Sequence, residues 1–445
     1  MLARAQLRII VVASLAGLLF GFDTAVIAGV TAALRQAFTL SPAGLGFAVS
    51  AALWGTLLGA IAGGRPGDRF GARSVLRLIG LLYSVSAIGC ALSPTLGWFV
   101  TFRFLTGVAI GASSVLAPVY IAEIAPPERR GALVGLFQIN IVIGILLAYV
   151  SNFAVAQLIG GDSVWRWKLA MAAIPAIAFF VLLFTIPHTP RWLLLKGRVA
   201  EATASLARLG AVDPAGAAAA LQSAAQRAGE APSERLSWAR HRRPILLAVG
   251  LALFNQLSGI NAILYYLGDI FAAGGFSSLS SDLQSVAIGL TNFLATLVGM
   301  SLIDRLGRRQ LLLVGSVGMA LAQGGVAAVM AANSAQALLL PLLVLFIASF
   351  AISQGAVIWV YLSEIFPTAV RARGQALGSA THWIMNAIIS AVFPAVAALS
   401  RPAPFAFFAL MMLLQLVLVV RFFPETRGVS LEEMQQALAA RSPAR

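Results

Sequence analysis

The sequence predicts an all-α membrane protein with twelve transmembrane helices in two pseudo-symmetric six-helix halves, joined by a cytoplasmic helical linker. Three observations lead to this fold class. The 445-residue chain is 60% hydrophobic and only 11% charged, whereas soluble domains carry about 25% charged residues. Twelve apolar runs approach the ~20 residues that cross a bilayer. Short motifs recur in the same order in both halves.

The twelve candidate spans fall into two groups of six. They lie near residues 8–30, 44–64, 74–93, 97–120, 131–152, 167–187, 244–270, 284–303, 310–332, 337–361, 374–397 and 403–423. The longest polar interruption separates the groups and contains alanine-rich stretches, one of which begins with proline in its first helical turn at Asp213-Pro214. We therefore divide the chain into an N-terminal half (1–189), a cytoplasmic linker (190–243), a C-terminal half (244–423) and a cytoplasmic tail (424–445).

The net charge of +15 is explained by membrane topology. With the N-terminus in the cytoplasm, most Lys and Arg residues fall in cytoplasmic segments, as the positive-inside rule expects. The exceptions are Arg35, Arg103, Arg166, Lys168 and Arg401. The first apolar run is long and shows no clear cleavage site, so it is interpreted as the first span. We expect a multi-pass protein of the inner (plasma) membrane, with both termini cytoplasmic, the lipid bilayer around it and no nucleic-acid partner.

Two pairs of motifs indicate that the halves are duplicates. VYIAEIAPPERRG (119–131) resembles VYLSEIFPTAVRARG (360–374), and GDRFGAR (67–73) resembles DRLGRR (304–309). One short motif can recur by chance, but two pairs in the same order at nearly one spacing favour a repeat. Parallel halves of this kind place a substrate site near the midplane where they meet.

Asp23 is a carboxylate inside the first apolar run. Such a group costs about 2.5–3.5 kcal/mol on insertion scales and by default indicates a functional site. Arg103, early in the fourth span, is its natural partner. Paired, Asp23 stays ionised; separated, it takes a proton, because an unpaired buried carboxylate is costly. The alternative is a static structural ion pair.

Charged residues at the cytoplasmic ends of spans recur in both halves. They suit a charge network that latches the halves closed on the inside, and the alternative is loop charge that only sets topology. The expected latch residues are Asp68, Arg69, Glu123, Arg129, Arg130, Asp304, Arg305, Glu364 and Arg371.

Further motifs make the chain similar to a known family. They are G-F-D-T-A-V-I-A-G (21–29), R-F-L-T-G (103–107), A-E-I-A-P-P-E-R-R-G (122–131), P-H-T-P-R-W-L-L (187–194), Q-L-S-G-I-N-A-I-L-Y-Y (256–266), E-I-F-P-T-A-V-R (364–371) and P-E-T-R-G (424–428). With the D-R-x-G loops, they resemble the sugar porter branch of the major facilitator superfamily, which includes bacterial proton–sugar symporters and facilitative glucose transporters. The resemblance covers nearly the whole chain.

The resemblance implies that the substrate is a small neutral sugar, a hexose or pentose. Gln138, Gln256, Asn261, Asn292, Trp359 and Asn386 match positions that contact sugar in the family, Phe20 and Trp383 match aromatic positions of its cavity, and Tyr265 and Tyr266 match its extracellular gate. It also implies that Asp23 and Arg103 match the proton-coupling pair. The alternative for the amides is hydrogen bonding between helices.

Two observations bear on this assignment: the spacing of Gln256 and Asn261, and the positions at which the chain differs from the family. Gln256 and Asn261 do not share a face of an ideal helix, although a break at Gly259 would realign them. Asn255 and His382, also expected in the substrate site, stand where relatives carry Gln and an Asn or Gln. Two more departures are a proline-free stretch at 355–359 and His188-Thr189 in place of Glu-Ser.

These features favour proton-coupled import of a monosaccharide by alternating access, by a protein expected to be a monomer. The alternatives are a facilitative sugar uniporter and, less favoured, a sugar sensor on a porter scaffold. An enzyme is disfavoured because three His and one Cys form no metal-ligand pattern and no phosphate-binding loop is present. No cofactor and no catalytic or metal site are expected.

Overall fold

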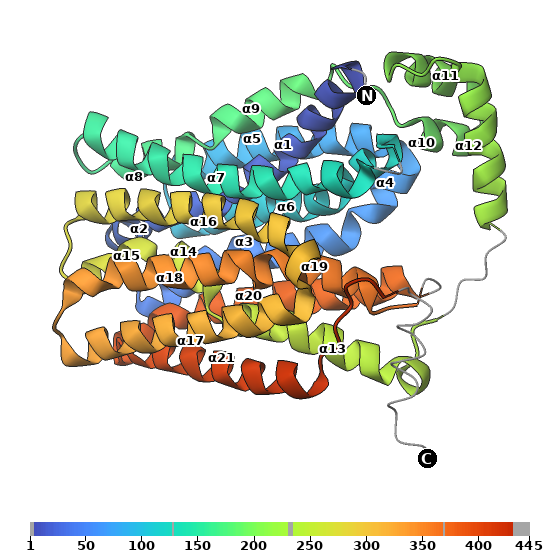
Figure 1. The fold of residues 1–445 in the computed structure, drawn as a ribbon. Coiled ribbons are helices and arrows are strands. Elements are labelled where there is room, and N and C mark those ends of the chain that lie inside the picture. The colour runs from blue at the N-terminus through green and yellow to red at the C-terminus, as the bar shows by residue number, and fades with distance from the viewer. Residues whose placement is uncertain (1–3, 127–128, 230–234, 368–369, 430–445) are drawn as a thin grey trace. The chain divides into compact units, whose positions relative to one another are not determined.

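The computed structural model describes residues 4–126, 129–229, 235–367 and 370–429 (Figure 1). Within these residues the chain is helical and contains no strand. Twelve helical spans there are long and apolar enough to cross a membrane, which confirms the predicted fold class. They run Arg4–Gly29, Pro42–Ala62, Ala72–Ala91, Leu96–Ile124, Arg130–Leu158, Val164–Leu182, Trp238–Tyr265, Ser278–Leu306, Arg308–Ala332, Gln336–Glu364, Arg371–Leu399 and Ala403–Phe422.

The exposed faces of these spans are apolar. Leu78 is 65% exposed, Val314 69% and Leu321 66%. Exposed apolar surface on this scale marks an interaction surface in a soluble protein. On helices of this length it fits contact with lipid tails.

Contacts divide the chain into two units. The first holds residues up to 30 and 51–231, and the second holds 31–50 and 232 onward. The first contains α1 (Arg4–Val26), α4 (Gly64–Phe70), α5 (Ala72–Ala91), α6 (Leu96–Ile124), α7 (Arg130–Leu158), α8 (Val164–Ala170), α9 (Ala173–Leu182) and the linker helices α10 (Pro190–Leu195), α11 (Val199–Arg208) and α12 (Pro214–Gly229). Helix α3 (Pro42–Ala62) begins among the residues of the second unit and continues in the first.

Small residues let α1 pack closely against α7 in the first unit. Gly17 and Gly21 of α1 face the backbone carbonyls of Phe137 and Ile141, and Gly144 of α7 faces that of Leu18. A side chain at any of the three glycines would collide with backbone. Close backbone approach through small residues is the usual way in which membrane helices associate.

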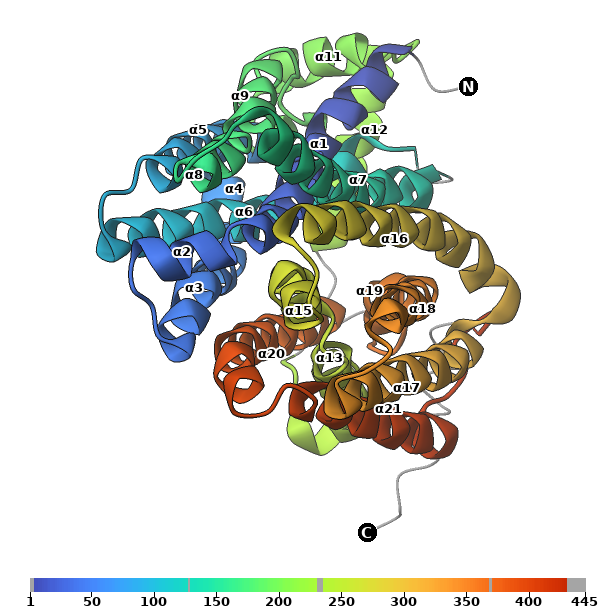
Figure 2. The same cartoon turned by 90° about the vertical axis from the view of Figure 1, so that its left-hand side faces the viewer.

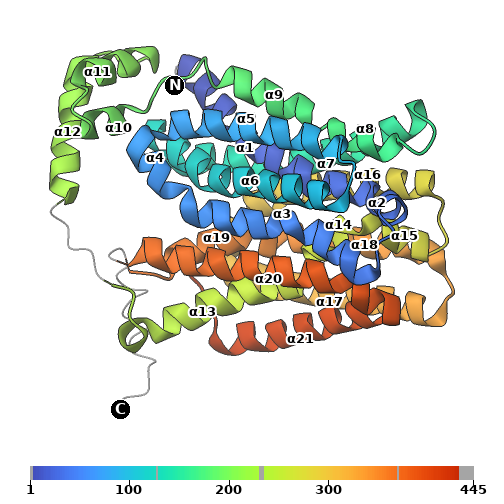
Figure 3. The same ribbon diagram turned by 180° about the vertical axis from the view of Figure 1, so that it is seen from behind.

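The second unit contains the remaining helices, seen end-on in Figure 2 and from behind in Figure 3. They are α2 (Thr31–Ala37), α13 (Trp238–Leu257), α14 (Ile260–Tyr265), α15 (Leu267–Ala273), α16 (Ser278–Leu306), α17 (Arg308–Ala332), α18 (Leu339–Ile352), α19 (Gln354–Glu364), α20 (Arg371–Leu399) and α21 (Ala403–Phe422). Helix α18 packs against both α16 and α17, and α17 packs along α21 (Figures 1 and 2).

Two spans of the second unit are interrupted. Gly259 adopts φ +79° between α13 and α14, in the left-handed region that glycine enters at little cost. Ser353 has φ −106° and ψ −93° between α18 and α19. The span that contains Ser353 therefore breaks although residues 355–359 include no proline.

The repeated D-R-x-G loops have the same backbone geometry. Gly71 lies at φ +86° and ψ 139°, and Gly307 at φ +90° and ψ 163°. That region is open almost only to glycine. Each glycine ends one helix and leads directly into the next, α5 or α17.

Candidate functional site

The predicted proton-coupling residues form a buried ion pair in the first unit. Arg103 Nη1 on α6 donates to Asp23 Oδ1 on α1 at 2.6 Å. The two side chains are only 5% and 9% exposed. Arg103 Nε is buried and has no hydrogen-bond partner among the described residues. The carboxylate is therefore matched by one guanidinium contact in an interior of low dielectric.

Polar side chains anchor the helix segment around this pair. The hydroxyl of Tyr83 donates to the Leu19 carbonyl at 3.1 Å, and Asn152 Nδ2 donates to the Val26 carbonyl at 3.2 Å. Lys168 Nζ donates to the Gly29 carbonyl at 3.1 Å. This last contact places a cation at the end of the first span, where free carbonyls collect.

The second unit brings four predicted substrate residues together as an amide cluster, defined here as Asn255, Gln256, Asn261 and His382. Gln256 Nε2 donates to Asn255 Oδ1 at 2.9 Å and lies 3.2 and 3.3 Å from the two ring nitrogens of His382. Asn261 Nδ2 donates to Gln256 Oε1 at 3.0 Å. The break at Gly259 thus lets the side chains of Gln256 and Asn261 meet.

Aromatic rings border the amide cluster. The ring of His382 lies 5.3 Å from that of Trp359 and 5.1 Å from that of Trp383, centroid to centroid. Trp383 is buried and Trp359 is 39% exposed. Apolar walls with a few convergent polar groups are typical of small-ligand sites.

Tyr265 and Tyr266 lie at the junction of α14 and α15, and both are buried. The Tyr266 hydroxyl donates to the Ser390 carbonyl at 2.9 Å, and its ring stacks on Phe393. Asn386 Nδ2 lies 3.5 Å from the Tyr265 hydroxyl. The predicted gate tyrosines are therefore in contact with α20, which also carries His382 and Trp383.

The other predicted substrate residues lie elsewhere on the helices. Asn292 is buried on α16 of the second unit. Phe20 on α1 and Gln138 on α7 are half-buried and belong to the first unit. Their roles in binding remain predictions.

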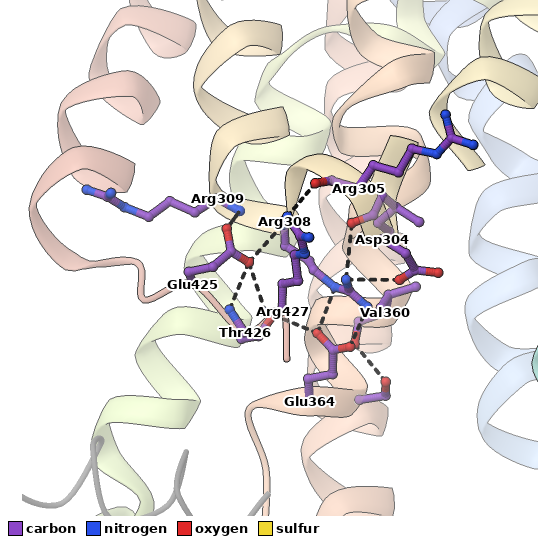
Figure 4. Close-up of polar contacts among 11 residues, drawn as sticks. Asp304, Arg305, Arg308, Arg309, Val360, Glu364, Glu425, Thr426 and Arg427 are labelled. Atoms are coloured by element: carbon purple, nitrogen blue, oxygen red, sulfur yellow. Dashed lines mark hydrogen bonds and ion pairs between the residues drawn. The ribbon is translucent and has the colours of Figure 1, made fainter. Parts of the chain in front are cut away.

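Charged residues of the second unit form a network at the ends of α16 and α19 (Figure 4). Arg308 donates to Glu364 at 2.8 and 3.1 Å and pairs with Asp304 at 3.1 Å. Thr426 Oγ1 donates to Glu364 at 2.6 Å. The Glu425 carboxylate accepts from the backbone N–H groups of Arg308 and Arg309 at 2.9 and 3.0 Å, which caps the N-terminus of α17.

The composition of this network differs from the prediction. Asp304 and Glu364 take part as side chains, whereas Arg305 contributes its carbonyl oxygen, which accepts from Arg427. Sequence reasoning did not include Arg308 and Glu425. Arg371 is half-buried at the start of α20. Arg308 begins α17 and Asp304 lies on α16, so their pairing crosses the turn at Gly307, which no helical spacing could indicate.

The corresponding region of the first unit keeps the backbone frame but lacks counterparts of Arg308 and Glu425. Tyr120 donates to the Pro187 carbonyl at 2.7 Å, as Tyr361 does to the Pro424 carbonyl at 3.2 Å. Ala72 follows Gly71, whereas Arg308 follows Gly307. Among the described residues we find no ion pair for Glu123.

The remaining predicted latch residues of the first unit are exposed. Asp68 and Arg69 lie at the end of α4, where Arg69 covers the Phe70 ring at 5.1 Å and the Asp68 carbonyl accepts from the Trp192 indole. Arg129 and Arg130 begin α7 and are exposed.

His188 stands at the position of this frame that Glu425 holds in the second unit. Its Nδ1 is buried without a hydrogen-bond partner among the described residues, and its ring stacks on Trp192 at 4.9 Å. Burial, with Arg73, Arg198 and Arg77 nearby, lowers the pKa of His188 to about 4. His188 is therefore neutral at physiological pH.

One further ion pair was not predicted. Arg35 Nη2 on α2 lies 3.2 Å from Asp269 Oδ1 on α15. Burial raises the pKa of Asp269, while Thr31 and Arg35 oppose that rise. Arg35 stood out in the sequence only as a basic residue outside the cytoplasmic segments.

Comparison with known proteins identifies the family. Residues 9–438 match the family described as "Sugar (and other) transporter". The chain is 33% identical to the D-xylose-proton symporter of Escherichia coli (strain K12) across 96% of this chain and 94% of that protein. It is 36% identical to the glucose transporter GlcP of Staphylococcus epidermidis across 98% of both.

A solved structure gives the same result. The chain superimposes on the partially occluded inward-open xylose transporter XylE from E. coli with a TM-score of 0.85 and 31% identity, covering 96% of this chain and all of that one. The protein therefore belongs to the sugar porter family of the major facilitator superfamily, a family of membrane transporters rather than enzymes.

Proposed function

We propose that this protein is a proton-coupled symporter that imports a monosaccharide by alternating access, with Asp23 as the proton site. The observation that carries the proposal is the buried Asp23–Arg103 pair in a transmembrane segment. Intramembrane ionisable groups usually mark ion pathways. The names of two relatives, a D-xylose-proton symporter and a D-xylose transporter, support the same reading.

Coupling follows from the cost of leaving Asp23 unpaired. With Arg103 in contact, the carboxylate is compensated and remains ionised. In a conformation where the two side chains separate, a proton neutralises Asp23, because an uncompensated buried charge costs several kcal/mol. A proton that binds one conformation better than the other shifts the population between them, and this differential affinity is all that coupling needs.

The amide cluster supplies the chemistry for a neutral sugar. Asn255, Gln256 and His382 are buried and Asn261 is half-buried, and the ring of His382 lies against the indole rings of Trp359 and Trp383. Uncharged amides hydrogen-bond hydroxyl groups, and aromatic faces pack against the apolar faces of a sugar ring. We also propose Asn292 as a sugar contact and Tyr265 and Tyr266 as the outer gate. Phe20 and Gln138 are the sugar contacts that we propose for the first unit.

Transport in proteoliposomes tests the function. Uptake of a panel of hexoses and pentoses is measured with and without an inward proton gradient, for wild type, Asp23→Asn and the exposed-carboxylate control Asp162→Asn. We expect wild type and the control to accumulate sugar against its gradient. Asp23→Asn should exchange sugar without accumulating it. Uptake by wild type that ignores the proton gradient would instead identify a uniporter.

The membrane orientation has its own test. We propose an inner-membrane monomer with cytoplasmic termini and a cytoplasmic linker. Cys90 is the single cysteine and is buried, so one introduced thiol can be labelled selectively. Val212→Cys in the linker should resist a membrane-impermeant maleimide added to intact cells, and Asp162→Cys should react. The reverse pattern would invert the topology.

A further inference from the structure

Three arginine side chains gather where α5 begins and α9 ends in the first unit. Arg77 Nε donates to the Leu183 carbonyl at 3.2 Å, and Arg208 Nη2 donates to the Thr185 carbonyl at 2.9 Å. Arg73 lies one turn before Arg77 on α5, and the charges of Arg77 and Arg208 are close enough to act on it. We call Arg73, Arg77 and Arg208 the arginine cluster. Since a guanidinium has five N–H donors and no acceptor, most donors of the cluster remain available.

No carboxylate among the described residues forms an ion pair with the arginine cluster. Glu201 is exposed and is bound by Arg198 at 2.6 Å. Arg73 Nε is buried and has no hydrogen-bond partner in the described part of the chain. A buried donor without an acceptor costs free energy unless a water or a ligand satisfies it. The cluster therefore combines surplus positive charge with an open, buried donor.

The repeat in the second unit carries a negative charge at the equivalent place. There the Glu425 carboxylate lies beside Gly307 and accepts from the backbone N–H groups of Arg308 and Arg309. The start of α17 thus has an anion supplied by the chain itself. An anion at a helix N-terminus is stabilised by the free N–H groups and by the helix dipole.

The start of α5 has the same backbone geometry without such an anion. The N–H groups of Ala72 and Arg73, which follow Gly71, have no acceptor among the described residues. His188 Nδ1 lies beside Gly71 and also makes no hydrogen bond there, while the imidazole stacks on Trp192. Because His188 is neutral, it brings no negative charge. An anion from outside the chain would supply what Glu425 supplies in the second unit.

The arginine cluster lies next to exposed apolar side chains at the ends of two spans. The Arg77 guanidinium covers the Phe184 ring at 4.2 Å, and Phe184 is 54% exposed. Leu78, which follows Arg77 in the sequence, is also exposed. An arginine that rests on an exposed ring at the end of a span suits the headgroup level of a bilayer. Phosphate groups of lipids collect at this level, and soluble phosphate reaches it from the water.

We propose that the arginine cluster binds a phosphate group beside His188, which takes the place of the carboxylate that the second repeat carries at Glu425. Arginine suits this ligand because its N–H groups bind phosphate oxygens in pairs. The phosphate belongs to an anionic lipid headgroup or to a soluble phosphate ion, and the recognition chemistry is the same for both. The bound phosphate compensates the cluster and stabilises the first unit. The inference is independent of the solute that the protein transports.

Thermal unfolding of the full-length protein in detergent tests the site. The Tm is measured with sodium phosphate against sodium chloride at equal ionic strength, and with dihexanoyl phosphatidylglycerol against dihexanoyl phosphatidylcholine. We expect phosphate, phosphatidylglycerol or both to raise the Tm of wild type by about 2 °C. The rise should shrink by at least about half in Arg73→Gln, because the buried donor of the site is lost.

Arg421→Gln is the matched control, because Arg421 is an exposed arginine at the end of α21. Its response to the ligands should equal that of wild type. Where Arg73→Gln fails to fold, Arg208→Gln replaces it. A wild-type Tm that neither phosphate nor phosphatidylglycerol raises would overturn the proposal, and so would an equal rise in the cluster variant and in Arg421→Gln.

His188→Glu supplies the missing carboxylate from within the chain. Its carboxylate and a bound phosphate would compete for the same donors, so we expect the ligands to raise the Tm of His188→Glu by less than half of the wild-type rise. Without ligand, the Tm of this variant should exceed that of wild type. A full wild-type response in His188→Glu would place the phosphate elsewhere and overturn the proposal.

The two ligands also identify the source of the phosphate. A rise in Tm with sodium phosphate means that soluble phosphate can occupy the site. A rise only with phosphatidylglycerol assigns the site to a lipid headgroup, in keeping with the exposed apolar side chains around Arg77. In that case native mass spectrometry should find fewer phosphatidylglycerol molecules on Arg73→Gln than on Arg421→Gln, and equal numbers would contradict the lipid site.

Discussion

Glu425 and His188 occupy equivalent positions in the two repeats, yet only Glu425 caps a helix. Each follows a proline whose carbonyl accepts from a tyrosine, Tyr361 or Tyr120. Each also lies where a side chain added to Gly307 or Gly71 would collide with it. The Glu425 carboxylate accepts backbone N–H groups at the start of α17, while the imidazole of His188 stacks on Trp192. The duplicated frame has thus kept its backbone in both repeats, whereas the capping carboxylate is present only in the second.

This difference predicts that substitution of Glu425 lowers the stability of the protein more than substitution of His188. Glu425→Gln removes the charge and one acceptor from a carboxylate that binds Arg308 and Arg309, so we expect a loss of about 1–3 kcal/mol. His188→Gln replaces a neutral side chain and should change stability far less. Thermal unfolding in detergent compares the two variants. A similar fall in Tm for both would contradict the assignment of a cap to Glu425 alone.

The stability lost on removal of Arg103 should be partly recovered when Asp23 is removed as well. Arg103→Gln leaves a buried carboxylate unpaired, which costs on the order of 3–5 kcal/mol. The double variant Asp23→Asn with Arg103→Gln has no buried charge left at this site and should be the more stable of the two. The Tm values of the single and double variants provide the measurement. A double variant no better than Arg103→Gln would mean that the pair contributes little.

A side chain at Gly259 should disturb the amide cluster. Gly259→Ala places a β-carbon at φ +79°, at a cost of roughly 1–2 kcal/mol, and that carbon would also meet the Phe408 ring. We expect α14 to shift, the Asn261–Gln256 hydrogen bond to weaken and KM for sugar to rise. Gly250→Ala is the matched control, because a side chain there meets open space within α13. Equal KM values in the two variants would refute this account.

Stability should depend on pH through Asp269. Because burial raises its folded-state pKa above the ordinary value, the ionised group destabilises the fold, and protonation relieves this cost as pH falls. The contribution is therefore most favourable at low pH and is lost as pH rises through the folded pKa. Asp269→Asn resembles the protonated form, so its Tm advantage over wild type should grow from pH 4 to pH 7.

Arg35→Ala adds a second comparison to this pH series. Without the guanidinium at 3.2 Å, the Asp269 carboxylate loses a favourable attraction. The Tm of Arg35→Ala should therefore depend on pH more steeply than the Tm of wild type. Asp162→Asn, an exposed carboxylate, should show no such trend. A Tm difference between Asp269→Asn and wild type that is independent of pH would sink this interpretation.

The helices and the central ion pair were predictable for physical reasons. Apolar length sets the spans, and a carboxylate inside the first apolar run, Asp23, suits a basic partner, of which Arg103 was the natural choice. The Gly259 break was predictable because Gln256 and Asn261 face apart on an unbroken helix. Which arginine pairs with Glu364 was harder to foresee. Arg308, at the start of α17, donates to Glu364, whereas Arg305 lies at the end of α16.

Other contacts depend on tertiary structure that no local pattern encodes. Glu425 lies in the short segment after the last span, far in sequence from α17, which it caps. Arg35 and Asp269 belong to short helices separated by more than half the chain. No proline at 355–359 indicates the break at Ser353 in the sequence. In the structure the Ser353 hydroxyl donates to the Ser349 carbonyl at this break.

The break at Gly259 also bears on how stiff this part of the molecule is. At the break the Ser258 hydroxyl donates to the Asn255 carbonyl at 2.6 Å, and Gln323 Nε2 donates to the Ser258 carbonyl at 3.1 Å. Side chains thus already satisfy backbone groups that an unbroken helix would pair internally. Rotation of α14 at this joint therefore breaks few backbone hydrogen bonds of the helix. The resistance to bending here comes mainly from side-chain contacts rather than from the helix backbone.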